Sequence, residues 1–290
     1  MGGAALPHER ENMEEFELLK KHGFAFKKQF GQNFLSDTNL LDAIVRDAGL
    51  GGGETVLEIG AGAGALTRAL ATKAKRVVAY EIDKSLQGVL SEALAGCDNV
   101  EVVFRDFMKE NLARLEKELG DYIVVANLPY YVTTPVVMKL IEEGTLCRGI
   151  TVMVQEEVAE RFCATAGTAE YSAITAAIAL RGSCRITRRV PRTMFFPRPN
   201  VDSAVVKITF EEGRISVLSR TAYREIVRVA FLNRRKTLEN NLLSAFRLTR
   251  PQAKELLAEG GVQEGARGET LPPEQFARLA DILVKKGICQ

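Results

Sequence analysis

The 290-residue chain has few cysteines and histidines, and they are poorly placed for a disulfide framework or a zinc site. Its five cysteines are scattered, and no two of them have the spacing that is typical of zinc ligands. Its two histidines, His8 and His22, lie outside the motifs described below. The cysteine pattern therefore predicts a reducing cytoplasmic environment and no bound metal.

An excess of charge of one sign and long apolar runs are also lacking. The net charge is only +2, so any affinity for nucleic acid has to come from local basic patches. We find no apolar run long enough to span a membrane, and the first 22 residues do not resemble a signal peptide. With 46% hydrophobic and 26% charged residues, the composition is typical of a soluble globular protein with a sizeable core.

Several short apolar runs alternate with amphipathic segments in the first half of the chain. Runs typical of buried strands occupy residues 55–60, 76–80, 100–104, 122–126 and 149–155. This alternation predicts an α/β fold, a doubly wound Rossmann-like sheet, and an alternating run at 204–210 adds another strand. After residue 210 the hydrophobic residues recur only at the spacing of helices. We therefore predict a loosely ordered segment over residues 1–22, the sheet domain over 23–211 and a small all-helical domain over 212–290.

A glycine-rich turn follows the first predicted strand. Gly60, Gly62 and Gly64 allow the backbone to approach a ligand closely. Glu81 ends the second strand about 20 residues later, where a carboxylate can accept hydrogen bonds from both hydroxyls of a ribose. The pattern from Gly60 to Ala65 also fits a degenerate dinucleotide fingerprint. The turn alone therefore leaves NAD, another adenosine cofactor and a turn without a ligand all open.

Polar residues also end the third and fourth predicted strands. Asp106 could accept a hydrogen bond from an adenine amino group, or it could cap a turn. The sequence Asn127-Leu128-Pro129-Tyr130 places an amide, a rigid turn and an aromatic ring at the carboxyl edge of the sheet, where ligands bind in such folds. These four residues suit a flat nitrogen base held by its amino group. The alternative is a polar turn with a packed tyrosine.

Basic residues cluster in three places. No acidic residue occurs between Tyr171 and Val201, and this arginine-rich stretch ends in a proline-braced Phe195 that could stack on an extruded base. Residues 233–236 form a second basic run, and residues 24–35 interleave aromatic residues with two lysines. These features indicate RNA binding, although solvated arginine faces around a buried phenylalanine would produce the same pattern.

Taken together, the motifs resemble those of the small-subunit ribosomal RNA adenine dimethyltransferase family of the KsgA/RsmA type. The resemblance runs from about Leu18 to the C-terminus and depends on the joint order of several motifs. These are Gly31–Leu35, Val56–Gly64, Glu81-x-Asp83, Asp106, Asn127–Tyr130, Val154–Arg161, Phe195–Ser203 and Arg234–Lys236.

The resemblance implies an S-adenosylmethionine-dependent methyltransferase. Its substrate would be two adjacent adenosines in a hairpin near the 3′ end of small-subunit (16S) ribosomal RNA, each methylated twice on N6. The partner would be a pre-assembled small-subunit particle, with no membrane and no metal involved. Nothing in the sequence indicates more than a monomer.

The resemblance also implies roles for individual residues. The target adenine would be contacted by Asn127, Leu128, Tyr130 and Phe195. The cofactor would be bound by Gln32, Asn33, Leu35, Gly60, Gly62, Glu81, Ile82, Asp106, Phe107 and Asn127. The RNA would be bound by Lys27, Lys28, Arg189, Arg198, Arg234, Arg235 and Lys236.

The chain departs from the family pattern at two places. Tyr131 stands where many relatives have Asn, and Glu170-Tyr171-Ser172 stands where a Tyr-Gly pair is common. Three alternative functions also remain. A large-subunit (23S) adenine N6-methyltransferase usually has Ile at the position of Leu128. The other two are an RNA-binding ribosome-assembly factor that has lost catalysis and an oxidoreductase built on a Rossmann sheet.

Overall fold

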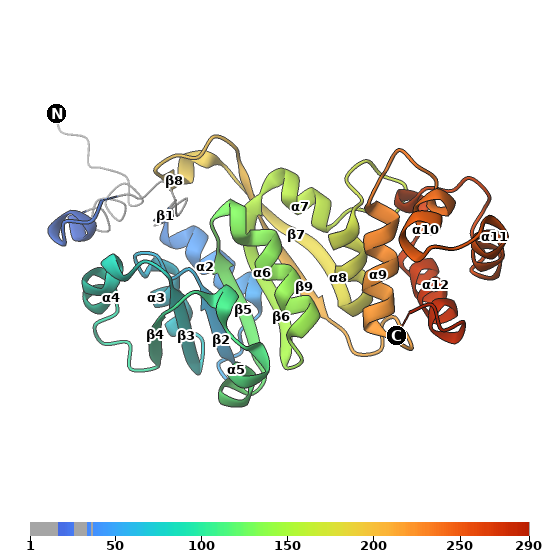
Figure 1. Ribbon diagram of the computed structural model, residues 1–290. Helices are drawn as coiled ribbons and strands as arrows, with labels where there is room; N and C mark the ends of the chain where they lie inside the picture. Colours follow the sequence, from blue (N-terminus) through green and yellow to red (C-terminus); the bar gives the residue numbers. More distant parts are fainter. Residues whose placement is uncertain (1–16, 26–33, 36, 290) are drawn as a thin grey trace. The chain divides into compact units, whose positions relative to one another are not determined.

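The computed structural model describes residues 17–25, 34–35 and 37–289 (Figure 1). The chain separates into two compact units. The sheet unit comprises Met1–Ala159 and Arg185–Thr209, and the helical unit comprises Glu160–Cys184 and Phe210–Gln290. The domain boundaries predicted from the sequence remain predictions, because a compact unit is not by itself an independently folding domain.

The central element of the fold is a seven-stranded mixed sheet with the order β4-β3-β2-β5-β6-β9-β7. Strands β2 to β6 are parallel, and β9 runs antiparallel to β6. The order confirms the predicted doubly wound α/β sheet. The strands are β2 Thr55–Ile59, β3 Arg76–Glu81, β4 Val100–Phe104, β5 Tyr122–Asn127, β6 Cys147–Gln155, β7 Gly182–Val190 and β9 Ser203–Phe210.

Strand β7 was not predicted, because its residues were interpreted only as part of a basic stretch. It lies at the edge of the sheet, where charged side chains are tolerated and an apolar alternation is not required. Arg188 of this strand is half-buried and binds Asp47 through two nitrogens, at 2.7 and 2.8 Å. The guanidinium of Arg188 and the carboxylate of Asp47 thus form a two-point ion pair that stabilises the fold.

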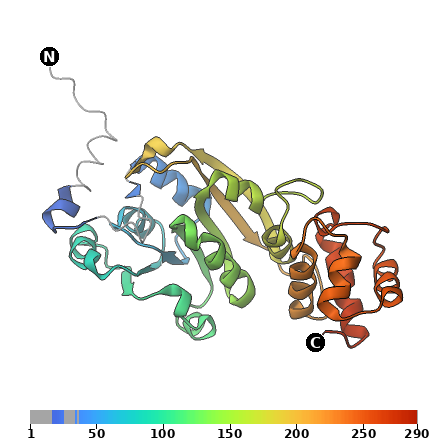
Figure 2. The same ribbon diagram turned by 45° about the horizontal axis from the view of Figure 1, so that its top comes forward.

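Helices flank the sheet (Figures 1 and 2). The α-helices around it are α2 Thr38–Ala48, α3 Ala65–Ala71, α4 Gln87–Ala93, α5 Leu112–Leu119, α6 Tyr130–Glu143 and α7 Glu156–Phe162. The short 3₁₀ helices are η2 Lys84–Leu86, η3 Phe107–Lys109 and η4 Arg192–Met194. Helix α2 begins after Asp37, whose side chain accepts a hydrogen bond from the amide of Leu40. It ends at Gly49, which adopts the left-handed conformation that is typical of a helix C-terminus.

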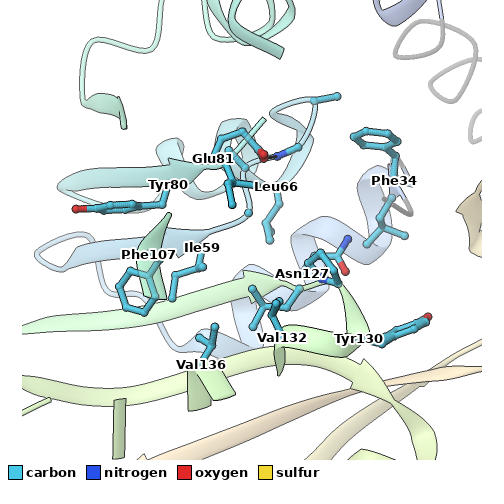
Figure 3. Close-up of a pocket in the computed structure, with 18 of the residues that line it drawn as sticks. Phe34, Ile59, Leu66, Tyr80, Glu81, Phe107, Asn127, Tyr130, Val132 and Val136 are labelled. Carbon is cyan, nitrogen blue, oxygen red and sulfur yellow. Dashed lines mark hydrogen bonds between the residues drawn. The ribbon is translucent and has the colours of Figure 1, made fainter. Parts of the chain in front are cut away.

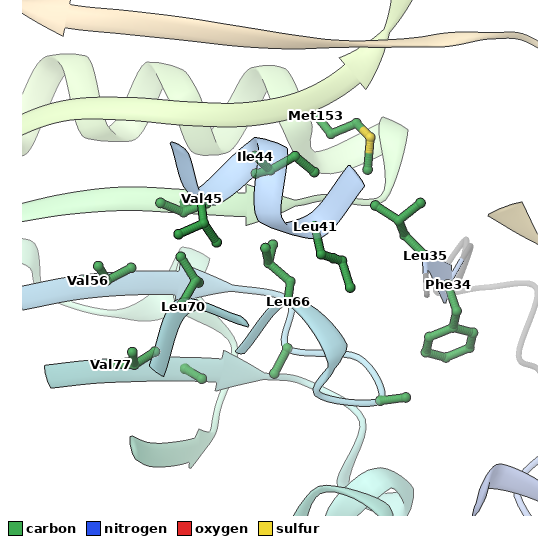
Figure 4. Packing of buried hydrophobic residues seen from close by; sticks show 14 of the residues in the cluster. Phe34, Leu35, Leu41, Ile44, Val45, Val56, Leu66, Leu70, Val77 and Met153 are labelled. Atoms are coloured by element: carbon green, nitrogen blue, oxygen red, sulfur yellow. The ribbon is translucent and has the colours of Figure 1, made fainter. Parts of the chain in front are cut away.

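The core beneath the glycine turn is built by α2, α3 and the parallel strands. Leu41 and Val45 of α2 face Leu66 and Leu70 of α3, and this layer covers Val56 of β2 (Figure 4). Strand β1 (Phe34–Leu35) adds its two apolar side chains to the same cluster. Because this core is close-packed, it fixes the position of the loops above it.

Strand β1 also connects two distant parts of the chain. It pairs antiparallel with β8 (Phe195–Phe196), so that Leu35 lies opposite Phe195. The pairing brings a segment from the beginning of the sheet unit to a segment near its end. As a result, Phe195 is held by a backbone ladder and not by an isolated loop.

The helical unit confirms the predicted all-helical character of the C-terminal part. Its helices are α8 Ala173–Arg181, α9 Arg220–Phe231, α10 Leu238–Phe246, α11 Arg250–Glu259, η5 Gly268–Thr270 and α12 Pro273–Lys285. Tyr223 is buried in its core and donates a hydrogen bond to the carbonyl of Ala176 at 2.9 Å. Among the described residues, no helix has the length and the apolar character that crossing a membrane would require.

Candidate active site

A pocket opens at the carboxyl ends of strands β2 to β5 (Figure 3). Its walls come from the glycine turn after β2, the ends of β3 and β4, the segment after β5 and Phe195 of β8. Parallel strands point their carboxyl ends to one edge, and this is why residues far apart in the sequence meet there. The polar residues predicted at the strand ends, Glu81, Asp106 and Asn127, all line this pocket.

The glycine turn brings bare backbone to the pocket. Gly60, Gly62 and Gly64 have φ values of 82°, 57° and 92°, which other residues adopt only at a cost. A Cβ atom on Gly62 would lie 3.2 Å from the ring of Phe34. One on Gly60 would lie 3.7 Å from the carbonyl oxygen of Asn127. The turn therefore needs glycine for its conformation, and at Gly62 also for the close contact with Phe34.

The Glu81 carboxylate is fixed by the backbone around it. Its Oε2 accepts a hydrogen bond from the amide of Gly62 at 2.9 Å, and its Oε1 accepts one from the amide of Asp83 at 2.8 Å (Figure 3). Burial raises the pKa of Glu81, and these two hydrogen bonds counteract that rise. Each oxygen retains a lone pair, so the carboxylate can still accept two hydroxyl donors.

Strand β4 ends in a short turn with two functions. Asp106 Oδ1 accepts a hydrogen bond from the amide of Met108 at 3.0 Å and so caps η3. The same residue lines the pocket, so the cap and the ligand contact proposed from the sequence are compatible. Phe107 lines the pocket as well and packs edge-to-face on Tyr80, with 5.7 Å between the ring centroids. Together with the half-exposed Ile82, these rings form apolar walls suited to a flat base.

The segment after β5 turns directly into helix α6. Helix α6 begins at Tyr130 and contains Pro135 within its length. Thr133 is buried and donates a hydrogen bond to the carbonyl of Pro129 at 3.2 Å. This bond supports the first turn ahead of the internal proline.

Two aromatic residues flank the end of this segment. The hydroxyl of Tyr130 lies 2.9 Å from that of Ser203 on β9, which sets the direction of the ring. Burial raises the pKa of Tyr130. Phe195 is buried and lines the same pocket, whereas its neighbour Phe196 is half-exposed. The pocket thus has a ring on each of two separate elements, α6 and β8.

Most of the residues predicted to bind the target and the cofactor line this one pocket. Those it brings together are Leu35, Gly60, Gly62, Glu81, Ile82, Asp106, Phe107, Asn127, Leu128, Tyr130 and Phe195. Gln32 and Asn33 lie outside the described residues. The sequence did not single out Tyr80, Met108 and Tyr131 as lining residues, although each lies beside a predicted one. Their position beside a predicted site residue was the signal in the sequence that could have identified them.

The predicted RNA-binding residues have different surroundings. Arg189 is paired with Glu156, whereas Arg198 is exposed. In the helical unit, Arg234 donates a hydrogen bond to the carbonyl of Ala169 at 2.9 Å. Arg235 and Lys236 beside it are exposed, and Lys27 and Lys28 lie outside the described residues.

Comparison with known proteins shows to which family the chain belongs. Residues 23–285 match the family model described as ribosomal RNA adenine dimethylase. The chain belongs to this family. It is therefore an S-adenosylmethionine-dependent methyltransferase, and the oxidoreductase alternative falls away.

Individual relatives agree with this family. Ribosomal RNA small subunit methyltransferase A of Geobacillus thermodenitrificans is 44% identical over 276 residues, which cover 92% of this chain and 94% of the relative. A dimethyladenosine transferase from Plasmodium falciparum has a similar structure, with a TM-score of 0.72, 26% identity and coverage of 88% and 98% of the two chains. The 23S rRNA methyltransferase ErmE has a TM-score of 0.67, 29% identity and coverage of 87% and 100%.

The lining residues fit the cofactor of this family. A buried carboxylate that keeps one lone pair on each oxygen suits the two hydroxyls of a ribose. A carboxylate and apolar walls at the end of β4 suit an adenine ring, which has a polar edge and flat faces. The glycine turn leaves room for close approach of the rest of the molecule.

A second buried carboxyl group, that of Glu58, lies on β2 just before the glycine turn. Its side chain is fully buried. Burial raises the pKa of Glu58 to about 8, and the negative charge of Glu81 contributes to the rise. Glu58 therefore carries a proton at neutral pH in the folded protein. In the unfolded chain it would ionise at its ordinary pKa of about 4.3.

This proton makes the stability of the sheet unit depend on pH. Between about pH 4.5 and pH 8, the unfolded chain releases the proton of Glu58 while the folded protein keeps it, so the free energy of unfolding falls by up to about 1.4 kcal/mol per pH unit. We expect Glu58→Gln to flatten this decline. Urea unfolding at pH 5.5 and 7.5 should show a loss that is about 2–3 kcal/mol smaller in the variant than in the wild type.

A matched control is Glu118→Gln, because Glu118 is exposed on α5 of the same unit. This variant should show the same pH dependence as the wild type. If Glu58→Gln and the wild type lose equal stability between the two pH values, Glu58 is ionised in the folded protein.

Proposed function

We propose that this methyltransferase transfers methyl groups to N6 of two adjacent adenosines in the 3′-terminal hairpin of small-subunit ribosomal RNA. The product would be N6,N6-dimethyladenosine, formed in the cytoplasm during small-subunit biogenesis. The observation that carries the proposal is the meeting of Asn127, Tyr130 and Phe195 in the pocket that also contains Glu81. Relatives 44% identical to the chain that are named for the small subunit support this choice of RNA.

The cofactor would lie along the carboxyl edge of the sheet. Glu81 would accept hydrogen bonds from its ribose, and Asp106 would accept one from its adenine amine. Ile82 and Phe107 would contact the faces of that adenine, because both line the pocket beside these carboxylates. Gly60 and Gly62 would contact the cofactor through their backbone, with Leu35, Gln32 and Asn33 on the methionine side.

The target adenine would be activated by hydrogen bonding. When bound, S-adenosylmethionine supplies an electrophilic methyl group. The N6 lone pair of adenine is delocalised into the ring, which makes the amine a poor nucleophile. Asn127 Oδ1 and the Leu128 carbonyl would accept hydrogen bonds from its two N–H groups, favour a pyramidal nitrogen and direct its lone pair. Positioning and preorganised dipoles would then supply most of the acceleration.

A neutral amide suits this role better than a carboxylate. Asn127 can accept a hydrogen bond without adding a negative charge to a pocket that already contains Glu81 and Asp106. No covalent nucleophile is needed, and the proton can leave to water after transfer.

Two aromatic rings would hold the extruded base. Tyr130 has its ring direction set by Ser203, and Phe195 is held by the β1–β8 ladder, so both rings are preorganised. Extrusion costs a few kcal/mol, and it costs least for a base in a loop. A second methylation requires that the slot between the rings also accept an adenine with one methyl group on N6.

Basic residues outside the pocket would bind the RNA backbone. Arg198 is exposed in the sheet unit, and Arg235 and Lys236 are exposed in the helical unit. Arg189, Arg234, Lys27 and Lys28 complete the proposed set. Because the protein has almost no net charge, such local groups have to supply the phosphate contacts. We propose that the monomeric enzyme acts on a pre-assembled small-subunit particle.

The second candidate function is methylation of an adenosine in large-subunit (23S) RNA. The structural similarity to ErmE, at 29% identity, is the observation in its favour. The small-subunit relatives are more similar in sequence, at 44% identity. An additional role in small-subunit assembly is compatible with the proposed catalysis.

The proposed substrate is tested by methyl transfer to both ribosomal subunits. We expect labelled S-adenosylmethionine to yield N6,N6-dimethyladenosine in undermethylated small subunits, at two adjacent positions of the 3′-terminal hairpin. Nucleoside analysis and primer extension would identify the product and its position. Label confined to large-subunit RNA would favour the second candidate, and label at other small-subunit positions would contradict the proposed site.

The stacking role of Phe195 is tested by Phe195→Leu, which keeps an apolar side chain but removes the ring. We expect kcat/KM for methyl transfer to fall by about 5- to 150-fold, equivalent to 1–3 kcal/mol for one stacked base. Phe104→Leu is a matched control, because Phe104 packs against the same core but does not line the pocket. Equal activity of the two variants at equal thermal stability would refute the stacking role.

A further inference from the structure

Two cysteines of the helical unit lie in direct contact. Cys163 follows helix α7, Cys184 lies in strand β7, and their sulfur atoms are 2.8 Å apart. Both are free thiols and both are partly exposed, so small molecules in solution can reach them. The two residues are 21 positions apart in the sequence, and the fold brings them together.

We propose that Cys163 and Cys184 form a reversible disulfide and so constitute a site of oxidative modification. A disulfide has an S–S distance of about 2.05 Å, so the two sulfur atoms need to approach by only about 0.8 Å. The contact joins the turn after α7 to strand β7, and both cysteines belong to the same compact unit. Closing the bond therefore requires the two sulfur atoms to move by less than about 1 Å toward each other.

The two thiols differ in reactivity. The hydrogen bond from the thiol of Cys184 lowers the pKa of Cys163, whereas the same contact and burial raise the pKa of Cys184. The thiolate is the reactive form of cysteine. Cys163 is therefore the thiol that attacks first, and Cys184 is the resolving thiol.

A peroxide supplies the oxidant for this step. The Cys163 thiolate attacks one oxygen of hydrogen peroxide, the O–O bond breaks, and a sulfenic acid and hydroxide form. Cys184 then attacks the sulfur of the sulfenic acid, an S–S bond forms, and the S–O bond breaks. The thiol proton and the proton released from Cys163 end in water. Two thiols thus lose two electrons, and one peroxide is reduced to two waters.

The disulfide would close a loop that contains helix α8. The chain enters the helical unit after Ala159 and leaves it after Cys184, so the bond would join the entering and the leaving segments. Within this loop, the amide of Gly167 donates a hydrogen bond to the carbonyl of Glu269 at 2.8 Å. A covalent bond between the ends of the loop would restrict the unfolded chain and so stabilise the folded unit.

The test is peroxide treatment of the reduced, folded protein followed by quenching, unfolding and alkylation. We expect the oxidised protein to take up two fewer alkyl groups than the reduced protein and to lose two hydrogen atoms in mass. Peptide mapping should join Cys163 to Cys184, and dithiothreitol should reverse the change. The melting temperature should rise by roughly 5 °C on oxidation.

Single serine variants provide the controls. Cys163→Ser and Cys184→Ser should each abolish both the loss of two alkylation sites and the rise in melting temperature. Cys97→Ser, which changes a partly exposed cysteine of the sheet unit, should preserve both effects. Alkylation of all five cysteines after peroxide treatment, or mapping of the disulfide to another pair, would overturn the proposal. Neither readout depends on methyl transfer, so the result is independent of the proposed substrate.

Discussion

The hydrogen bonds of the Glu81 carboxylate determine the shape of the pocket. One carboxylate joins the end of β3 to the turn after β2 through the amide of Gly62, and it orders its own loop through the amide of Asp83. Because the side chain is buried, these bonds act in a medium of low dielectric constant, where they are strong and where their loss would be costly. The same carboxylate lines the pocket and keeps a lone pair on each oxygen, and in the proposed function these accept hydrogen bonds from the ribose of the cofactor.

The opposite wall of the pocket depends on contacts between segments that are far apart in the sequence. Tyr130 is anchored to Ser203 of β9, 73 residues away, and Phe195 is positioned by the pairing of β8 with β1. These two anchors hold aromatic rings on separate elements, and Asn127 lines the same pocket. In the proposed mechanism the protein needs no strongly acidic or basic catalyst, because preorganised dipoles and rings supply the positioning.

The sequence predicted the half of the site that is set by the parallel sheet. Glu81, Asp106 and Asn127 each follow a buried strand, and the carboxyl ends of parallel strands meet at one edge, so their convergence followed from topology. Strand β7 was missed because an edge strand rich in arginine lacks an apolar alternation. The contacts of Tyr130 with Ser203 and of Cys163 with Cys184 could not be predicted either, since they depend on how distant elements pack.

The most direct test of the account is the turnover of Asn127→Ala at saturating S-adenosylmethionine and small-subunit substrate. If Asn127 orients the N6 amine, kcat should fall by about 100- to 1000-fold, the scale of one preorganised hydrogen-bonding group, while substrate affinity stays near the wild-type value. Asn127→Asp should be impaired as well, because it adds a negative charge to a pocket that already contains Glu81 and Asp106. A kcat close to that of the wild type in Asn127→Ala would contradict the central claim that this amide prepares the target nitrogen for methyl transfer.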